Sequence, residues 1–340
     1  MIGVGLYGLG RLGRSLFRLL YPREDVRLLA VHDTAEPAAL EYLLRFDTRL
    51  GRLPEALSVR EGHLYVAGRR IPFLAGSETP AVPRWGDLGV HTVLDASTAP
   101  RTRRDLEAHL DAGARRVILL APPVEPADAT IVIGVNEEAI SPSHRIVSAA
   151  TGTAHCLAPV GAILAGAFGV RRALYTSVHS YTTAHQLADV PAEDQRRGRA
   201  AAENIIPQDS RSASIVEELV PGLRGRLTGF AVNVPVSRGS AVDLVCWHEK
   251  PVTVEAVNEV LRTAAGSLRW KGVLGYETEP IVSSDVAGSS SSAVVDSLAT
   301  MVLPPGVSKT LSWYDEDSGY AARAVDLVER YAAKEAEAAA

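Results

Sequence analysis

A glycine-rich segment near the start of the chain has the spacing of a phosphate-binding turn. The pattern Gly8-x-Gly10-x-x-Gly13 follows the apolar segment Ile2–Tyr7 and leads into a segment with helical periodicity. The first glycine of such a pattern allows a tight turn, the second lets the backbone approach a pyrophosphate, and the third permits close helix packing. Asp33 follows about 20 positions after the last glycine. The pattern therefore predicts a dinucleotide bound at a helix N-terminus, where unpaired N–H groups and the helix dipole attract anions.

The acidic residue at the end of the second apolar segment bears on which dinucleotide binds. A carboxylate at Asp33 would accept hydrogen bonds from ribose hydroxyls, and its negative charge would repel a 2′-phosphate. We therefore expect NAD to be preferred over NADP. A turn without a ligand is the alternative for three glycines alone, but the flanking strand, helix and acid favour the nucleotide.

Composition restricts the class of protein and its partners. The chain has 340 residues, enough for two domains, and its 46% hydrophobic and 22% charged residues are typical of globular proteins. The net charge of -5 comes from acidic and basic residues mixed along the chain, so we expect neither nucleic acid nor membrane as a partner. Cys156 and Cys246 lie in apolar segments, which favours buried free thiols and a cytoplasmic location.

The segments that must position the glycine turn alternate between strand and helix. Predicted strands alternate with predicted helices over the first 150 residues, which indicates an α/β fold with a doubly wound parallel sheet, a Rossmann dinucleotide-binding domain. The predicted strands are Ile2–Tyr7, Val26–Val31, Val90–Leu94 and Arg116–Leu120, and the helix before the last of them is Arg101–Ala112.

The pattern changes near residue 150. Thr151-Gly152-Thr153 begins a long apolar helix, and long strand-like segments follow, which predicts a second domain of the α+β class. These strand-like segments are Ala173–His179, Leu227–Val236 and Ala241–Glu249. We predict a nucleotide domain over residues 1–150 and a second domain over 151–316, with the C-terminal helix over 317–340 placing Lys334 and Glu337 on a solvated face.

Short motifs in a fixed order resemble one enzyme family over nearly the whole chain. They include Gly8-Leu9-Gly10-Arg11-Leu12-Gly13-Arg14, Phe46-Asp47-Thr48, Gly134-Val135-Asn136, Cys156-Leu157-Ala158-Pro159, Val178-His179-Ser180-Tyr181-Thr182, Asn204-Ile205-Ile206-Pro207 and Ser312-Trp313-Tyr314-Asp315. With these motifs the chain resembles the glyceraldehyde-3-phosphate dehydrogenases. The resemblance implies an NAD domain completed by the C-terminal helix, a catalytic domain, and a homotetramer in which an irregular loop, about 183–205, lies near a neighbour's cofactor.

The chemistry that the resemblance implies depends on a residue that this chain lacks. In the family an aldehyde is bound to a cysteine as a thiohemiacetal, hydride passes to NAD, the thioester is released to phosphate, and a histidine assists. Gly152 stands at the cysteine position, and a residue without a side chain forms no thioester. Cys156 lies one helical turn further on, where we expect a buried, protonated thiol. His179 matches the histidine, either as an acid or base or as a retained scaffold residue.

Further departures fall at positions that the family uses for cofactor and substrate. Asn233 stands where an arginine would bind the substrate phosphate, Arg211 replaces a glycine of the phosphate loop, and Glu316 replaces the asparagine that would hold the nicotinamide. The expected cofactor contacts are Gly8, Gly10, Arg11, Leu12, Gly13, Asp33, Ser97, Thr98 and Glu316. The expected substrate or anion contacts are Thr151, Thr153, Thr182, Arg197, Ser210, Arg211 and Asn233.

Three functions are compatible with this pattern. The first is an NAD-dependent oxidoreductase that acts on a small anionic metabolite by direct hydride transfer, with His179 as acid or base. The second is a non-redox enzyme with bound NAD that uses Glu316 and His179 as an acid/base pair, and the third is a non-catalytic NAD-binding subunit. A metal site built from His155, His179, His185 and Glu316 is not expected, because their spacing matches no ligand motif.

Overall fold

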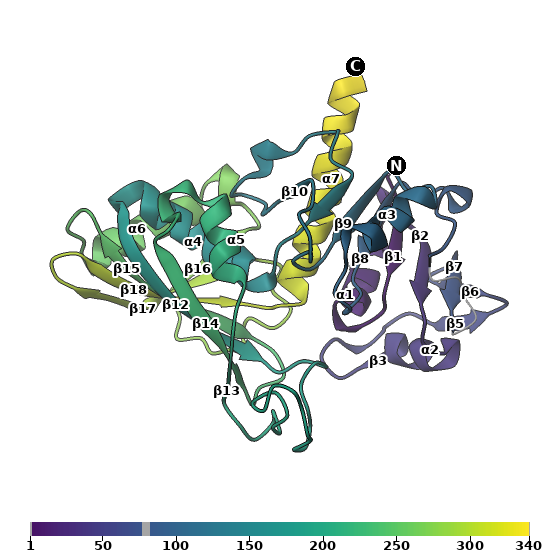
Figure 1. The fold of residues 1–340 in the computed structure, drawn as a ribbon, viewed down its shortest axis with the longest axis horizontal. Helices are drawn as coiled ribbons and strands as arrows, with labels where there is room; N and C mark the ends of the chain where they lie inside the picture. The colour runs from purple at the N-terminus through teal and green to yellow at the C-terminus, as the bar shows by residue number, and fades with distance from the viewer. Residues whose placement is uncertain (1, 77–81, 340) are drawn as a thin grey trace. The chain divides into compact units, whose positions relative to one another are not determined.

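The chain is described here by a computed structural model that covers residues 2–76 and 82–339 (Figure 1). Contacts between Cα atoms divide these residues into two compact units. The first unit contains residues up to 131, residues 138–150, and residues from 321 onward, and the second contains residues 132–137 and 151–320. None of the helices in the described ranges is long and apolar enough to cross a membrane.

The first unit is built on a nine-stranded sheet with the order β10-β11-β9-β8-β1-β2-β7-β6-β5. Its strands are β1 (Ile2–Tyr7), β2 (Val26–Asp33), β5 (Leu57–Arg60), β6 (His63–Val66), β7 (Arg69–Ala75), β8 (Thr92–Asp95), β9 (Arg116–Leu119), β10 (Ala129–Thr130) and β11 (Ile146–Ser148). Neighbours from β10 to β7 are parallel, whereas β5, β6 and β7 pair antiparallel. The order from β7 to β11 through β1 is that of a doubly wound dinucleotide-binding sheet, so the predicted fold class is confirmed.

Apolar side chains explain why these strands form a buried sheet. Val4 and Leu6 of β1 and Val93 of β8 have no exposed surface, as expected for a parallel sheet covered on both faces. The helices of this unit are α1 (Arg11–Leu20), α2 (Pro37–Arg45), α3 (Arg103–Asp111) and most of α7 (Ser318–Ala339). Short 3-10 helices cover Gly86–Leu88 and Glu137–Ala139, and β3 (Phe46–Asp47) pairs with β4 (Gly51–Arg52) outside the large sheet.

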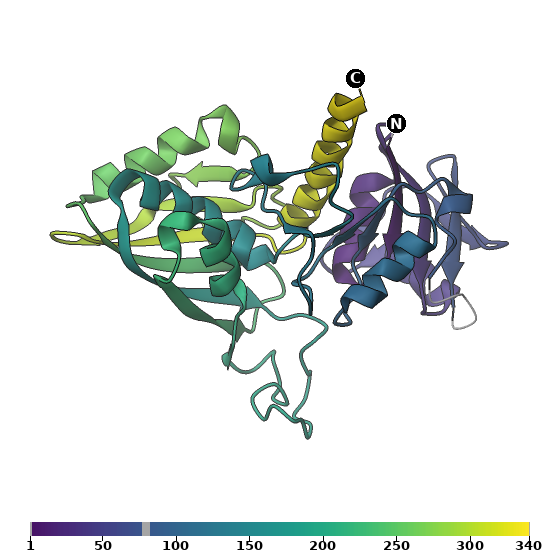
Figure 2. The same ribbon diagram turned by 45° about the horizontal axis from the view of Figure 1, so that its top comes forward.

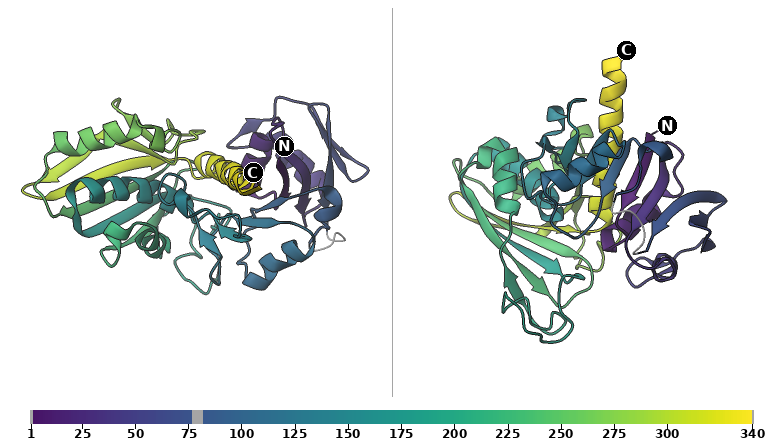
Figure 3. Two further views of the ribbon diagram at one scale, coloured as in Figure 1. Left: turned by 90° about the horizontal axis from the view of Figure 1, so that it is seen from above. Right: turned by 45° about the vertical axis from the view of Figure 1, so that its right-hand side comes forward.

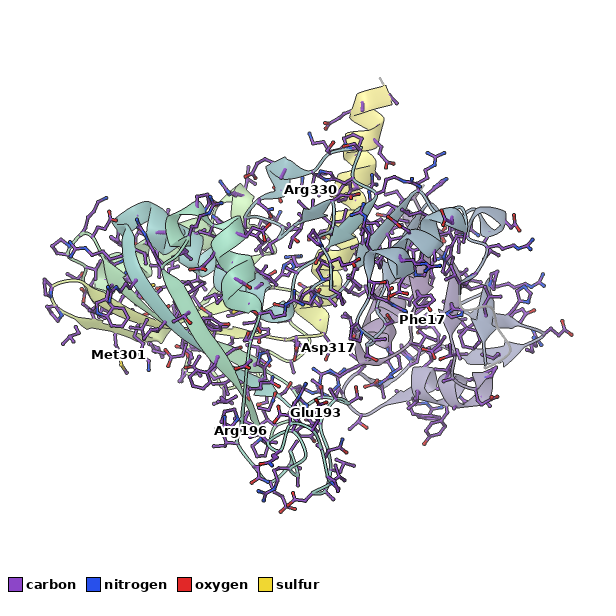
Figure 4. All side chains as sticks on the ribbon, viewed as in Figure 1. Phe17, Glu193, Arg196, Met301, Asp317 and Arg330 are labelled. Carbon is purple, nitrogen blue, oxygen red and sulfur yellow. The ribbon has the colours of Figure 1, made fainter. Side chains whose placement is uncertain are left out.

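The C-terminal helix α7 joins the first unit from residue 321 onward. Arg116 of β9 lies over the ring of Tyr331 at 4.0 Å and donates a hydrogen bond to Glu335 over 2.6 Å. These contacts hold α7 against the start of β9. Figure 4 labels Arg330 on this helix. Lys334 and Glu337 form an exposed ion pair at 2.8 Å, so the predicted solvated face is confirmed.

The second unit has helices on one face of a seven-stranded sheet (Figures 2 and 3). The strand order is β13-β14-β12-β15-β18-β17-β16. These strands are β12 (Val170–Ser180), β13 (Ile206–Gln208), β14 (Leu227–Val234), β15 (Ser240–His248), β16 (Leu274–Glu277), β17 (Ala293–Leu303) and β18 (Val307–Tyr314), and the helices are α4 (Gly152–Phe168), α5 (Ser212–Leu219) and α6 (Val254–Ala265) with 3-10 turns at Pro221–Leu223 and Leu268–Trp270.

Alternation along β12 and β14 decides which side chains face the helices. Ala173, Tyr175 and Ser177 of β12 are buried, whereas Leu174 between them is 47% exposed. In β14, Phe230 is also 47% exposed and Ala231 is buried. Successive side chains of a strand point to opposite faces, so odd-numbered residues of both strands lie on the helix-covered face and even-numbered residues lie on the open face.

The irregular loop that the sequence predicted over about 183–205 lies between β12 and β13. Residues 181–205 contain no helix or strand, and one isolated bridge joins Gln186 to Ala200. Figure 4 labels Glu193 and Arg196 on this loop. The side chains that the loop carries are therefore placed by turns and local hydrogen bonds.

Candidate functional site

A cavity of about 380 Å³ lies in the first unit at the carboxyl ends of β1, β2 and β8. This is where ligands bind in open α/β sheets. Five of the predicted cofactor residues line the cavity, namely Gly8, Gly10, Asp33, Ser97 and Thr98. Arg11, Leu12 and Gly13 belong to the first turns of α1 beside it.

Gly8, Gly10 and Gly13 differ in the space around their Cα atoms. Gly8 has a φ of +94°, and a Cβ there would lie 3.0 Å from the Ser97 nitrogen. A Cβ on Gly13 would lie 2.0 Å from the Gly8 carbonyl oxygen, so α1 packs against the turn at that point. A Cβ on Gly10 would meet only Thr98 Cγ2, at 4.0 Å, which leaves its surface open to a ligand.

The start of α1 suits a pyrophosphate. Its N-cap, Gly10, makes no side-chain cap hydrogen bond, and the first turn contains no acidic residue. Asp33 at the end of β2 accepts hydrogen bonds from the Leu9 nitrogen at 2.6 Å and the Ala35 nitrogen at 2.9 Å. A carboxylate has about four acceptor positions, so the same group can also accept ribose hydroxyls. The residues present therefore fit a dinucleotide.

Six residues that line this cavity were not predicted from the sequence, and Tyr7, His32 and Arg101 are among them. The rings of Tyr7 and His32 stack at 4.6 Å, and the Arg101 guanidinium lies over the Tyr7 ring at 5.0 Å. Arg101 Nε donates to Asp95 over 3.1 Å. Burial alone would raise the pKa of Asp95, but hydrogen bonding from His109 and the Arg101 charge outweigh it, and the pKa is lowered. Asp95 is an acidic residue at the end of the apolar strand β8, and this position could have indicated a cationic partner such as Arg101.

In the second unit His179 is the centre of a polar cluster. Its Nε2 lies 3.0 Å from both Thr153 Oγ1 and Ser177 Oγ, and its Nδ1 lies 3.3 Å from the Tyr314 hydroxyl. Glu316 Oε2 lies 3.7 Å from the same Nδ1. The His179 side chain is 12% exposed and that of Glu316 is 28% exposed, so this edge of the cluster is open to a solute.

Gly152 is the first residue of α4, beside Glu316. Thr151 caps the helix, since its Oγ1 accepts a hydrogen bond from the Ala154 nitrogen at 3.0 Å. A Cβ on Gly152 would lie 3.3 Å from Glu316 Cγ and 3.7 Å from Tyr314 Cε2. The Glu316 side chain thus lies next to the space that a side chain at Gly152 would enter.

The titratable groups around this cluster are held in defined states. Burial and then the Glu316 charge raise the pKa of Tyr314 well above its usual value, so the phenol stays protonated. Burial also raises the pKa of the Cys156 thiol, and it raises that of Cys246 to about 12. Both cysteines are free and buried, so the prediction of buried free thiols is confirmed.

Asn233 lies beside His179 on the helix-covered face. The two residues are register partners on the parallel strands β14 and β12, and Asn233 is 1% exposed. Its Oδ1 accepts a hydrogen bond from Gln208 Nε2 at 3.5 Å. Its Nδ2 is buried and has no hydrogen-bond partner within the described ranges. Asn233 therefore presents an unused donor next to the histidine.

The other predicted substrate residues lie in two groups. Thr151 Oγ1 contacts Ser212 Oγ at 2.9 Å, and Ser210 Oγ accepts from the Tyr175 hydroxyl at 2.9 Å. Arg211 is exposed at the N-cap of α5 between these two serines.

Thr182 and Arg197 lie instead on the loop 181–205, where Arg197 is exposed. Thr153 already belongs to the His179 cluster. The structure thus brings Gly152, Thr153, His179 and Glu316 together, with Asn233 alongside.

Sequence reasoning did not select Ser177, Tyr314, Gln208 or Ser212. A signal was present for two of them, because Ser177 precedes His179 by two residues in a strand and Tyr314 precedes Glu316 by two at a strand end. Side chains two apart on a strand share a face. Among the described residues, no group of three or more His, Cys, Asp or Glu is arranged to hold a metal ion.

Comparison with known proteins gives a consistent result over the whole chain. Residues 2–103 match the family model "Glyceraldehyde 3-phosphate dehydrogenase, NAD binding domain", and residues 151–316 match the corresponding C-terminal domain. The glyceraldehyde-3-phosphate dehydrogenases of Priestia megaterium and Geobacillus stearothermophilus are each 42% identical over 335 residues, which is 98% of this chain and 99% of theirs. That of Streptomyces coelicolor is 40% identical over 328 residues, 96% of this chain and 97% of its own. The chain belongs to the glyceraldehyde-3-phosphate dehydrogenase family, whose N-terminal domain binds NAD.

Proposed function

We propose that this chain is an NAD-dependent oxidoreductase that has lost the cysteine nucleophile and acts on a small anionic metabolite without a thioester intermediate. The observation that carries the proposal is the surrounding of Gly152. Neither thiol of the chain is accessible, and the Glu316 carboxylate beside Gly152 lies 3.7 Å from His179. In place of the family's cysteine nucleophile, this chain has the carboxylate of Glu316 as a second titratable group next to His179.

NAD would be held by the residues of the first-unit cavity. Gly10 and the N-terminus of α1 would receive the pyrophosphate, and Asp33 would accept the ribose hydroxyls. The carboxylate of Asp33 also supports preference for NAD over NADP, because it repels a 2′-phosphate. When bound, NAD supplies the group that accepts or donates a hydride.

His179 would exchange a proton with the substrate oxygen at Nδ1, the ring nitrogen nearer to Glu316. Glu316 would place a negative charge 3.7 Å from the imidazolium that forms. Tyr314, which keeps its proton, would hold the ring in position through its contact with the same nitrogen.

The substrate would be bound by neutral hydrogen-bond donors together with exposed arginine side chains. The unused Nδ2 of Asn233 lies on the His179 side of β14. The hydroxyls of Thr151, Thr182 and Ser210, with Arg197 and Arg211, would provide the anion contacts predicted from the sequence. A proton relay and a positioned substrate suffice for direct hydride transfer.

The test is an assay of NADH absorbance with purified full-length protein and a panel of small carbonyl-containing acids and phosphate esters. Oxidation of NADH by at least one substrate, without any requirement for inorganic phosphate, is the expected result. If no compound changes NADH absorbance, the oxidoreductase proposal is wrong.

A second candidate has its own observation. The Glu316–His179 pair could act as acid and base in a non-redox reaction with bound NAD, which would convert a substrate without net NAD reduction. Product formation without a change in NADH would select this candidate. A thermal shift with NAD but no turnover of any metabolite would select the non-catalytic NAD-binding subunit.

We also propose that the chain assembles as a homotetramer in the cytoplasm. The free, buried cysteines support a reducing compartment. The open face of the second-unit sheet exposes the apolar side chains of Leu174, Phe230 and Trp247. Exposed apolar side chains on one sheet face support contact with another copy of the chain.

Replacing Phe230 on this face with aspartate is expected to lower the molecular mass in solution from that of four chains to that of two or one. Phe230 is 47% exposed, so the fold loses little packing while a contact between copies would bury an unpaired charge. Light scattering after size-exclusion chromatography measures the mass, with the exposed Val124→Asp of the first unit as the control. An unchanged tetramer would exclude this face as a subunit contact.

Restoring the thiol by Gly152→Cys is expected to leave oxidation of glyceraldehyde 3-phosphate at least about tenfold slower than in the Geobacillus stearothermophilus relative. The new Cβ would lie 3.3 Å from Glu316 Cγ, and the charge-assisted contact absent at Asn233 is worth roughly 1.5–3 kcal/mol. The triple variant Gly152→Cys, Glu316→Asn, Asn233→Arg should be faster than the single one. Full activity of the single variant would mean that Glu316 and Asn233 have little effect.

A further inference from the structure

His185, on the loop 181–205, has a fixed tautomer. Its Nδ1 lies 3.0 Å from the backbone nitrogen of Thr182 and 3.1 Å from the Thr182 hydroxyl. A backbone N–H can only donate, so Nδ1 must be the acceptor and carries no proton. The reverse bond from the His185 nitrogen to the Thr182 carbonyl, at 3.1 Å, closes this turn. The single proton of the neutral ring is therefore on Nε2.

The Nε2–H of His185 has no acceptor in the described part of the chain. This atom is buried and makes no hydrogen bond to any residue within 2–76 and 82–339. Buried donors in folded proteins are nearly always paired, and an unpaired one lowers stability. The exceptions point to a partner that the chain does not itself provide, which is a water or a ligand.

The charges that act on His185 are those of the proposed site. Burial lowers the pKa of His185, and the charges of Arg197 and His179 lower it further. The backbone hydrogen bond with Thr182 and the Glu316 charge raise this pKa without reversing the net effect. The ring is thus neutral at neutral pH, as the hydrogen bond from Thr182 requires. A neutral imidazole near an arginine is a donor for an anion without being a proton source itself.

We propose that His185 is a substrate-binding residue whose Nε2–H donates a hydrogen bond to an anionic oxygen, from a carboxylate or a phosphate group. The proposal rests on the proposed function, because it places this donor in the substrate site of His179. His185 would contribute to specificity for an anionic substrate. The loop turn at Thr182 holds the imidazole ring, and the ligand would accept the hydrogen bond from Nε2–H. His185 takes no part in proton exchange.

Binding of simple anions to the full-length protein tests this directly. Wild type, His185→Phe and His185→Gln are titrated with methyl phosphate and, separately, with acetate, while the imidazole ¹⁵N resonances are recorded. His185→Phe keeps a planar ring but loses the donor, His185→Gln keeps an N–H donor, and the exposed His91→Phe is the control.

The expected spectrum of wild type has a protonated Nε2 and an unprotonated Nδ1 for His185, and the Nε2 resonance shifts with one of the anions. His185→Phe should bind that anion at least about tenfold more weakly, the loss of one charge-assisted hydrogen bond, and His185→Gln should recover part of the affinity. Tighter binding of methyl phosphate identifies a phosphate ligand, and tighter binding of acetate identifies a carboxylate.

The inference fails if wild type binds neither anion, if the His185 resonance does not respond, or if His185→Phe binds as wild type does. These results leave the NADH assay untouched, so the oxidoreductase proposal would still stand. Conversely, anion binding through His185 in a protein that never oxidises NADH would overturn the oxidoreductase proposal alone.

Discussion

Replacing His179 with glutamine is expected to lower kcat of the NADH-dependent reaction by about 10²–10⁴-fold, the usual contribution of a general acid or base. Glutamine can keep hydrogen bonds to Thr153 and Ser177, which both contact the ring at 3.0 Å, but it cannot exchange a proton. The fold should persist, because the side chain is 12% exposed and its neighbours are polar. Steady-state kinetics with the best substrate of the carbonyl panel measures the change.

Two further variants separate catalysis from scaffolding. Glu316→Gln removes the charge 3.7 Å from His179 and should lower kcat by a smaller factor, whereas His91→Gln, exposed in the first unit, should leave it unchanged. A His179→Gln enzyme with wild-type kcat would show that the histidine is only a retained scaffold residue.

Substituting alanine at Gly10 is expected to weaken NAD binding at least about tenfold, equal to roughly 1.4 kcal/mol, without lowering Tm. Gly10 has φ -60° and ψ -166°, which alanine adopts, and a Cβ there would meet only Thr98 Cγ2 at 4.0 Å. The loss would therefore come from the ligand, because the methyl group occupies the space that the pyrophosphate needs. Isothermal titration calorimetry with NAD gives the affinity.

In contrast to Gly10→Ala, the neighbouring Gly13→Ala should lower Tm. Its Cβ would lie 2.0 Å from the Gly8 carbonyl oxygen, so α1 must shift. We expect this shift to lower the free energy of unfolding by about 1–3 kcal/mol, and each kcal/mol to lower Tm by roughly 2–4 °C. Gly166→Ala, inside α4 with nothing within 4 Å, is the control and should be neutral or stabilising. Equal NAD affinity in Gly10→Ala and wild type would place the dinucleotide elsewhere.

The glycine turn of the NAD-binding domain could be predicted because its determinants are close in sequence. A strand, a glycine turn, a helix and an acid within residues 2–33 form one local unit, and each glycine is defined by its own backbone. Ser97 and Thr98, which follow β8, were predicted as well. The position of Arg101 over Tyr7 was not predicted, because it depends on the pairing of β1 with β8.

The second-unit site could be predicted only as separate positions. The resemblance pointed to Gly152, His179 and Glu316, but their contact depends on α4, β12 and the end of β18 meeting over 164 residues of chain, from 152 to 316. The amide of Gln208 and the hydroxyl of Tyr314 have no local signature, so only packing selected them.

By itself the sequence determined the fold class, the family, the glycine turn and the absence of a thiol at position 152, since periodicity, spacing and residue type suffice for each. The tertiary structure decided that Glu316 lies beside Gly152 and His179, and that Asn233 and His185 have buried donors to which no described residue is an acceptor. Those properties arise from distances between side chains on different elements, and no pattern along one chain segment encodes such distances.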